Sequence, residues 1–136
     1  MERLDEKSIE KLLLRAREAR EAAYAPYSGF RVGAALLSRD GRVFLGCNVE
    51  NVSFGAANCA ERTAVFSAVA AGCREFSAIA ISAGDEIVFP CGICRQVLAE
   101  FSPELTVICG KTGGYELFCL SELLPHGFTN SRLKKH

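Results

Sequence analysis

Three cysteines and one glutamate constrain this chain more than any other feature of its sequence. Glu61 follows Cys59 by two residues, and Cys91 and Cys94 form a Pro-Cys-x-x-Cys segment that begins at Pro90. Three thiolates make a soft site suited to zinc, which takes four ligands in a tetrahedron. No fourth cysteine stands at a metal-ligand spacing from these three. The sequence therefore predicts one Zn²⁺ per chain at the three cysteines, with a fourth position open to water, as in catalytic zinc sites.

The positions of these residues on predicted helices decide whether they can share a pocket. Cys91 and Cys94 are three residues apart at a helix start, so they lie on one face. Cys59 and Glu61 would lie roughly 200° apart on a regular helix. We therefore predict that Cys59 occupies the N-terminal boundary of a helix over 59–71, where its backbone is not helical. The partial positive charge at helix N-termini also favours the thiolates that zinc needs.

Glu61 and Arg62 are the candidates for chemistry beside the metal. Glu61 is the only carboxylate within two residues of a proposed ligand. One carboxylate in that place can carry both proton transfers in the hydrolysis of an amidine-like C–NH₂ group. Arg62 can compensate the negative charge of a cluster of three thiolates. Each residue also has an ordinary interpretation, as a solvated helix glutamate or a surface arginine, and the Pro-Cys-x-x-Cys segment alone also suits a redox pair or half of a zinc knuckle.

Composition excludes several classes of partner. A chain of 136 residues is enough for a single domain, here 1–136. Sixteen basic and sixteen acidic residues give a formal net charge of zero, so nucleic acid is not an expected partner and a small, weakly charged substrate fits better. We expect no membrane span and no signal peptide. Seven cysteines, an odd number, indicate reduced thiols and a cytoplasmic protein, and the four outside the metal motif are expected to act as small buried hydrophobes.

Hydrophobic periodicity predicts alternating helices and strands. The expected helices cover residues 5–24, 59–71 and 91–101, with a last turn at 121–124, and the expected strands cover residues 30–37, 43–49, 76–83, 105–109 and 115–120. The pair Asp40-Gly41 favours a hairpin between the first two strands. The last two strands are too close in sequence to be parallel. The strand–helix alternation from 43 to 109 implies parallel pairing in its middle, so we predict an α/β sandwich on a mixed five-stranded sheet.

Five separate segments are distributed across most of the chain: Phe30-Arg31-Val32-Gly33-Ala34-Ala35, Asn48-Val49-Glu50-Asn51, Cys59-Ala60-Glu61-Arg62-Thr63-Ala64, Pro90-Cys91-Gly92-Ile93-Cys94-Arg95-Gln96-Val97 and Leu123-Leu124-Pro125. In their order and spacing they resemble the cytidine deaminase family in its short homotetrameric form. A ligand-x-Glu pair followed by Pro-Cys-x-x-Cys is the known signature of zinc deaminases. The resemblance implies a three-layer α/β/α cytidine deaminase-like fold. It also implies hydrolytic deamination of cytidine and deoxycytidine in pyrimidine salvage, with Glu61 as proton shuttle.

The resemblance implies further roles for residues outside the metal motif. Asn48 and Glu50 would hydrogen-bond the sugar hydroxyls, and Phe30 would line the pyrimidine pocket. The backbone around Ala60 would meet the edge of the base. Phe128 would reach the pocket of a neighbouring chain in a homotetramer and pack on the bound base. Taken alone, Asn48 and Glu50 are also ordinary polar residues at a strand end, and one exposed phenylalanine is unremarkable.

The chain departs from the family pattern at two positions. Phe54 stands where many relatives carry tyrosine, so a hydroxyl contact from that position is absent. Cys59 replaces the histidine ligand of the larger dimeric members, which makes the cluster more negative.

Two alternative functions remain open. They are an aminohydrolase acting on another substrate, such as blasticidin S or a free base, and a structural zinc module that binds a partner. Glu50 favours a substrate with a sugar, and a site with three protein ligands disfavours structural zinc.

Overall fold

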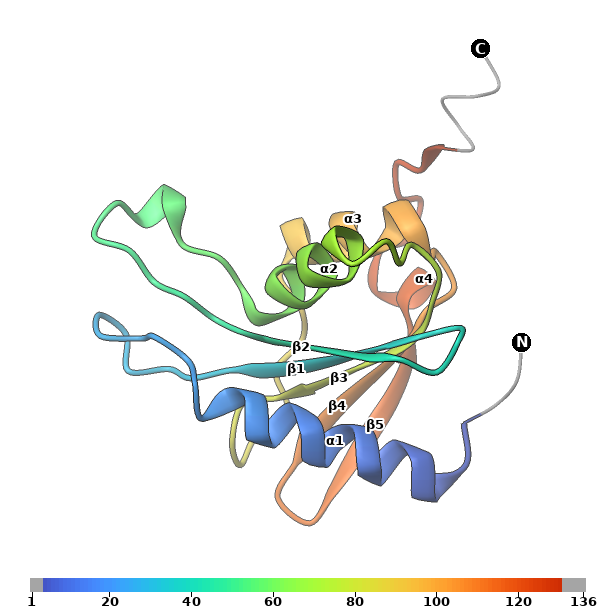
Figure 1. Ribbon diagram of the computed structural model, residues 1–136, viewed down its shortest axis with the longest axis horizontal. Helices are drawn as coiled ribbons and strands as arrows, with labels where there is room; N and C mark the ends of the chain where they lie inside the picture. Colours follow the sequence, from blue (N-terminus) through green and yellow to red (C-terminus); the bar gives the residue numbers. More distant parts are fainter. Residues whose placement is uncertain (1–3, 131–136) are drawn as a thin grey trace.

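A five-stranded sheet in the order β2-β1-β3-β4-β5 forms the centre of the computed structural model, which describes residues 4–130 (Figure 1). The strands are β1 (Gly33–Ser38), β2 (Val43–Cys47), β3 (Phe76–Ser82), β4 (Thr106–Lys111) and β5 (Gly114–Cys119), and the helices are α1 (Glu6–Arg20), α2 (Ala60–Ala70), α3 (Gly92–Phe101) and α4 (Leu120–Leu123), with a short 3₁₀ turn, η1 (Phe54–Ala56). Helix α1 covers one face of the sheet, and α2, α3 and α4 lie on the other (Figure 1). The predicted three-layer α/β/α fold is confirmed.

The strand pairing is mixed, as predicted. Strand β1 is antiparallel to both β2 and β3, and β4 is antiparallel to β5. The turn after β1 contains Gly41 at φ 91°, which confirms the predicted hairpin. Among the five strands of residues 4–130, only β3 and β4 pair in parallel, and α3 connects them. The parallel pairing expected within residues 43–109 is therefore found between these two strands, whereas β2 pairs with β1 and lies at the edge of the sheet.

Two apolar layers hold the helices on the sheet. On one face, Ile9, Leu12 and Leu13 of α1 pack against small residues of β1 and β3 and against Ile108 of β4. On the other face, the core is formed by α2 and α3 with the opposite side chains of β1, β3 and β4. The inner strands are therefore covered on both sides, whereas β2 is only half-buried because it forms an edge.

Helix α1 begins where the sequence predicted and ends earlier. The Asp5 carboxylate caps it by accepting the Ser8 N–H at 2.8 Å. The helix ends at Arg20 rather than at residue 24, because the backbone around Tyr24 bonds to a different segment. The Tyr24 N–H donates to the Asn48 carbonyl at 3.0 Å, and the Glu50 N–H donates to the Tyr24 carbonyl at 2.8 Å. These long-range bonds replace the last turn that the periodicity predicted.

Two glycines let a helix approach the sheet more closely than any other residue would. A Cβ added at Gly46 of β2 would lie 2.3 Å from the Ala60 carbonyl oxygen in the first turn of α2. A Cβ added at Gly33 of β1 would lie 2.0 Å from the Ala16 carbonyl oxygen of α1. Each helix backbone therefore rests directly on a strand backbone.

Within residues 4–130, no helix combines the length and the apolarity that a membrane crossing requires. The sequence predicted a tail after Pro125, and the part of it from residue 131 onward lies outside the described residues.

Candidate metal centre and its surroundings

The three predicted metal ligands come together at the starts of two helices. Cys59 is the N-cap of α2 and Cys91 the N-cap of α3, both with extended backbone, and Cys94 lies in the first turn of α3. The Cys59 and Cys91 sulfurs are 3.7 Å apart, and the Cys91 and Cys94 sulfurs are 3.4 Å apart. The prediction that Cys59 occupies a helix boundary is confirmed.

The spacing and chemistry of the three sulfurs fit zinc. With Zn–S bonds of about 2.3 Å, a tetrahedral site separates its sulfurs by about 3.8 Å. All three sulfurs lie within 4.8 Å of one another, and they form the only such group of three potential ligands found among residues 4–130. The three protein donors leave a tetrahedral ion one further position, which is the pattern of a catalytic site.

Arg62 lies beside this cluster and stabilises negative charge on it. Its Nη2 donates to the Cys59 sulfur at 3.4 Å. A hydrogen bond from Cys94 and the Arg62 guanidinium together lower the pKa of Cys59 to about 5. The same hydrogen bond, with burial, raises the pKa of Cys94, and contact with the Cys59 thiolate raises the pKa of Arg62. Arg62 is therefore placed where the sequence expected a compensating charge.

Glu61 lies in the first turn of α2 and is almost completely buried, at 4% exposure. Burial raises the pKa of Glu61 to about 7, and the negative charge of Cys59 acts in the same direction. Most helix glutamates lie on the surface, where water hydrates the charged carboxylate. Burial of Glu61 removes this hydration. The interpretation of Glu61 as a solvated helix charge is therefore wrong.

A second segment, residues 48–50, lies directly beside the start of α2. Val49 and Asn58 exchange two backbone hydrogen bonds, each of 2.9 Å, so this segment ends next to Cys59. The Asn48 side chain bridges it to residues 30–32, which directly precede β1. Its Oδ1 accepts the Val32 N–H at 2.8 Å, and its Nδ2 donates to the Phe30 carbonyl at 2.8 Å. Asn48 thus holds the segment that carries Phe30, a role that the sequence did not indicate.

Glu50 is held with its carboxylate already ordered. It accepts the backbone N–H groups of Tyr27 at 2.9 Å and Ser28 at 3.1 Å, and also the Ser28 hydroxyl. The Ser28 hydroxyl and the two N–H groups lower the pKa of Glu50, so it remains an ionised acceptor. Glu50 also lines an open cavity of about 330 Å³ with five other residues: Tyr27, Ser28, Asn51, Phe54 and Ala57. Sequence reasoning missed Tyr27 and Ser28, and only their place in the Tyr-Ser-Gly turn could have drawn attention to them.

The remaining predicted site residues fall into two places. Ala60 is fully buried between Cys59 and Glu61, and Phe30 is half-exposed before β1. Phe128 is 65% exposed, and its carbonyl accepts a hydrogen bond from Gln96 of α3 at 2.6 Å. In Figure 1 the C-terminal segment rises on the opposite side of α2 and α3 from the projecting segment 50–58. Phe128 therefore does not complete the cavity beside Glu50 in its own chain.

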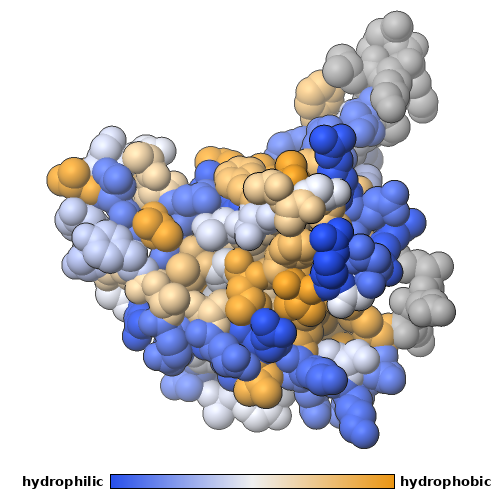
Figure 2. All heavy atoms as spheres, viewed as in Figure 1, coloured by the Kyte–Doolittle hydropathy of each residue, from blue (hydrophilic) through white to orange (hydrophobic). Residues whose placement is uncertain are grey.

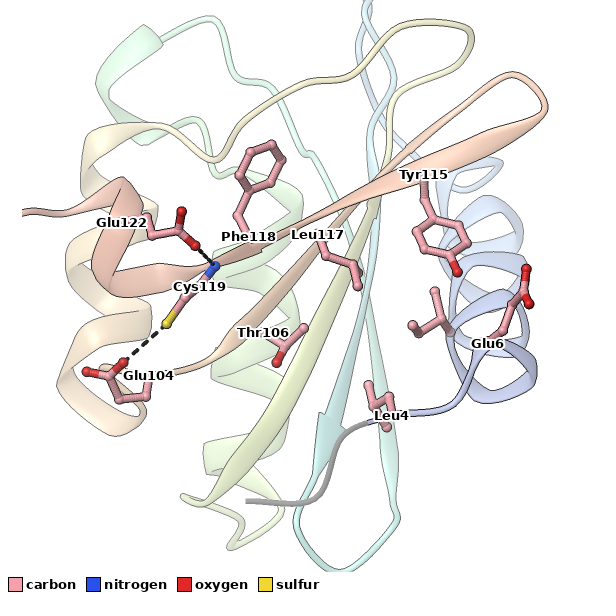
Figure 3. A pocket seen from close by; sticks show the side chains of 10 residues that line it. Leu4, Glu6, Glu104, Thr106, Tyr115, Leu117, Phe118, Cys119 and Glu122 are labelled. Carbon is pink, nitrogen blue, oxygen red and sulfur yellow. Dashed lines mark hydrogen bonds between the residues drawn. The ribbon is translucent and has the colours of Figure 1, made fainter.

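The cavity in Figure 3 is separate from the metal centre. It lies between the start of α1 and the edge strand β5, and none of its lining residues belongs to the cysteine cluster. The Cys119 thiol there contacts the Glu104 carboxylate at 3.2 Å and the Ser121 hydroxyl at 3.1 Å. Cys119 is thus a polar partner at the start of α4. The prediction that it acts as a buried small hydrophobe is wrong, although it holds for Cys73 and Cys109.

Comparisons with known proteins agree with this geometry. Residues 6–110 match the family described as the cytidine and deoxycytidylate deaminase zinc-binding region. The chain is 48% identical over 128 residues to the cytidine deaminase of Sporosarcina psychrophila, a match that covers 92% of this chain and 94% of the relative. It is 52% identical over 121 residues to the cytidine deaminase of Halalkalibacterium halodurans, covering 87% and 92%. The crystal structure of cytidine deaminase from Burkholderia pseudomallei superposes with a TM-score of 0.85 at 52% identity, covering 88% of this chain and 98% of that one.

Proposed function

The chain belongs to the cytidine and deoxycytidylate deaminase family, and from this we propose that it is a zinc-dependent hydrolase that converts cytidine and deoxycytidine to uridine and deoxyuridine. The products include one ammonia molecule per nucleoside. The observation that carries the proposal is the group of three sulfurs within 4.8 Å of one another at the starts of α2 and α3, together with the buried Glu61 in the first turn of α2. A structural zinc module would normally close its metal with four protein ligands.

Glu61 is proposed as the group that moves protons in this reaction. A zinc ion held by Cys59, Cys91 and Cys94 supplies a Lewis acid that makes water acidic enough to lose a proton near neutral pH. Glu61 accepts this proton as the water oxygen bonds to C4 of the pyrimidine, and it passes the proton to the ring nitrogen N3. Glu61 then takes the remaining proton from the new C4 hydroxyl and gives it to the amino group. The C4–N4 bond breaks as the C4 carbonyl forms, and ammonia leaves.

Glu50 and Asn48 are proposed to select a nucleoside over a free base. The Glu50 carboxylate is ionised and fixed by Tyr27 and Ser28, and its remaining lone pairs can accept hydrogen bonds from sugar hydroxyls. Because the carboxylate is ordered before binding, little conformational entropy is lost when the sugar arrives. Asn48 uses one amide hydrogen on Phe30 and keeps a second for the sugar. A substrate that lacks the sugar leaves these groups unpaired.

The base is proposed to lie between Phe30 and the start of α2. The Asn48 amide holds the backbone on both sides of Arg31, and this supports the proposal that the neighbouring Phe30 lines the base pocket. At the other side, Ala60 lies in the first turn of α2, where backbone N–H groups have no partner within the helix. These N–H groups and the nearby carbonyls can meet the polar edge of the pyrimidine.

A homotetramer is proposed because the pocket of one chain is open and its apolar surroundings are exposed. Phe66 of α2 and Ile93 of α3 are 51% and 61% exposed, and apolar residues gather over these helices and on the projecting segment 50–58 (Figure 2). Phe128 does not line the Glu50 cavity of its own chain, and its exposed ring is proposed to pack on a base bound by a neighbour. Truncation after Pro125, followed by sedimentation and activity measurements, tests this. An active wild-type monomer indifferent to the truncation would refute it.

The substrate proposal is tested by the release of ammonia. Purified protein is incubated with cytidine, deoxycytidine, cytosine and blasticidin S, and zinc is measured in the same preparation. We expect ammonia from the two nucleosides and about one zinc ion per chain. Ammonia from cytosine or blasticidin S alone would favour the alternative aminohydrolase. Zinc without ammonia from any of the four would favour a partner-binding module.

Two further properties are proposed: the domain organisation and the cellular location. Residues 1–136 are taken as one catalytic domain, because a single sheet carries both apolar layers of the described part. A cytoplasmic location is proposed because the three ligand cysteines must remain reduced to bind zinc. Cell fractionation with an antibody against the chain tests the location.

A further inference from the structure

Arg95 directly follows the ligand Cys94, and its guanidinium donates hydrogen bonds to two backbone carbonyls. Its Nε donates to the Pro90 carbonyl at 2.7 Å, and its Nη1 donates to the Leu123 carbonyl at 2.6 Å. Pro90 is completely buried and directly precedes the ligand Cys91, and Leu123 is the last residue of α4. The guanidinium therefore lies between the segment that delivers one metal ligand and the end of the last helix.

The same residue also holds the second carbonyl next to Cys91. The Arg95 backbone N–H donates to the Cys91 carbonyl at 2.9 Å. Arg95 thus binds the carbonyls of both peptide groups that adjoin the Cys91 Cα, one through its side chain and one through its backbone. Peptide groups are planar, so only the φ and ψ of Cys91 lie between them. Holding both peptide groups fixes the direction of the Cα–Cβ bond of Cys91, from which the sulfur extends.

The two carbonyls that adjoin the Cys59 Cα are held without an arginine side chain. At Cys59 the preceding carbonyl, that of Asn58, accepts the backbone N–H of Val49 at 2.9 Å, and the Cys59 carbonyl accepts the N–H of Thr63 at 3.1 Å. Two different segments hold this ligand. Cys91 instead follows residues 83–90, which contain no helix or strand, and Arg95 makes both bonds. The bond to the Cys91 carbonyl is a helix backbone bond that any residue at position 95 would make, so the bond to the Pro90 carbonyl is the one that depends on the arginine side chain.

We propose that Arg95 is a positioning residue for the metal: its guanidinium orients Cys91 for ligation and ties this ligand to α4. Lysine cannot replace it, because an ammonium on a flexible stem lacks the rigid fork that reaches both carbonyls. The proposal rests on the zinc site of the proposed function. It concerns the retention and geometry of the metal, and Arg95 is not assigned any contact with substrate.

The test compares Arg95→Lys with the matched control Arg15→Lys on the exposed surface of α1. Zinc-loaded proteins are mixed with a colorimetric chelator, and the rate of zinc release is followed. Removal of a group that orients a metal ligand typically costs about 10- to 100-fold in affinity. We expect zinc release from Arg95→Lys to be faster by about that factor, with no change in Arg15→Lys. In Co²⁺-substituted protein, we expect the thiolate-to-metal absorption to change only in Arg95→Lys.

Each outcome of this test decides the role of Arg95. Release within about twofold of wild type, with an unaltered cobalt spectrum, would overturn the proposal. If Arg95→Lys does not fold alone, the second measurement is circular dichroism with added zinc. Folding that is restored by zinc supports the positioning role, because metal binding then contributes the missing order. A chain that stays unfolded at saturating zinc assigns Arg95 a general structural role instead. A wild-type protein that binds no zinc would refute the proposed function itself.

Discussion

Replacing Gly46 by alanine tests whether the close contact between β2 and α2 sets the geometry of the metal centre. The added Cβ would lie 2.3 Å from the Ala60 carbonyl oxygen and 2.5 Å from the Ala64 nitrogen. Both atoms belong to the backbone of α2, so no side chain can rotate away. Ala60 stands between the ligand Cys59 and the buried Glu61. Any relief of the contact therefore moves the start of α2.

The size of the movement follows from the contact distance. Nonbonded atoms rest at about 3.5 Å, so the Ala60 carbonyl must move by about 1.2 Å from its present 2.3 Å. Overpacking of this kind costs about 1–3 kcal/mol, and the reduced freedom of the unfolded chain offsets about 0.4–1 kcal/mol of it. For a domain of this size the net loss lowers Tm by roughly 2–10 °C. A displacement of about 1 Å at catalytic groups can reduce the rate about 100-fold.

The assay pairs Gly46→Ala with Gly33→Ala. At Gly33 the added Cβ would lie 2.0 Å from the Ala16 carbonyl oxygen of α1, on the opposite face of the sheet from α2. Both variants should lose stability in thermal unfolding. Only Gly46→Ala should lose kcat/KM for cytidine by about 10- to 100-fold when measured well below Tm. Zinc content is measured alongside.

Two results would refute this reasoning. If Gly46→Ala unfolds at the wild-type temperature, the strand and the helix do not make the close contact described above. If both variants lose stability but keep the wild-type kcat/KM, the position of the first turn of α2 does not control the reaction. Equal losses of kcat/KM in the two variants would show a general effect of instability.

Three further substitutions separate metal binding, proton transfer and sugar recognition. Cys94→Ala should lose zinc and fold stability together, and full zinc content by metal analysis would remove Cys94 from the ligand set. Glu61→Gln should keep zinc and fold but lose deamination by about 100-fold or more; activity within about tenfold of wild type would rule out the proton shuttle. Glu50→Ala should keep zinc and raise KM for cytidine, and an unaltered KM would rule out the sugar contact.

The sequence predicted each half of the metal site well because the geometry within each half is local. Cys59 and Glu61 can share a pocket only if Cys59 lies outside the regular helix, and it is the N-cap of α2. Cys91 and Cys94 are neighbours on any helix that starts at this segment. The strands were predicted for a similar reason, since their apolar runs depend on short stretches of sequence. In each case the deciding interaction joins residues only a few positions apart.

The parts that the sequence did not indicate depend on contacts between distant segments. Asn48 holds Val32 and Phe30, which are 16 and 18 residues away. Arg95 reaches Leu123, 28 residues away. In both cases the partner is a backbone group, which every residue has, so the partner's side chain leaves no trace in the sequence. The same limitation explains the early end of α1, where the backbone of Tyr24 bonds to segment 48–50.

The location of the metal centre follows from the topology of the sheet. Strands β3 and β4 are parallel, and α3 connects them, so α3 begins at the carboxyl end of β3. Helix α2 enters β3 through a short turn, so its N-terminus lies toward the same end. The carboxyl edge of parallel strands is where α/β folds usually bind ligands. Two helix N-termini, each with about half a positive charge, converge there, and Arg62 adds a full charge 3.4 Å from the Cys59 sulfur. The helix N-termini and the Arg62 charge both stabilise thiolates at this edge. A thiolate one turn further along either helix would lose this stabilisation. This is why two of the ligand cysteines occupy the caps and the third, Cys94, lies in the first turn of α3.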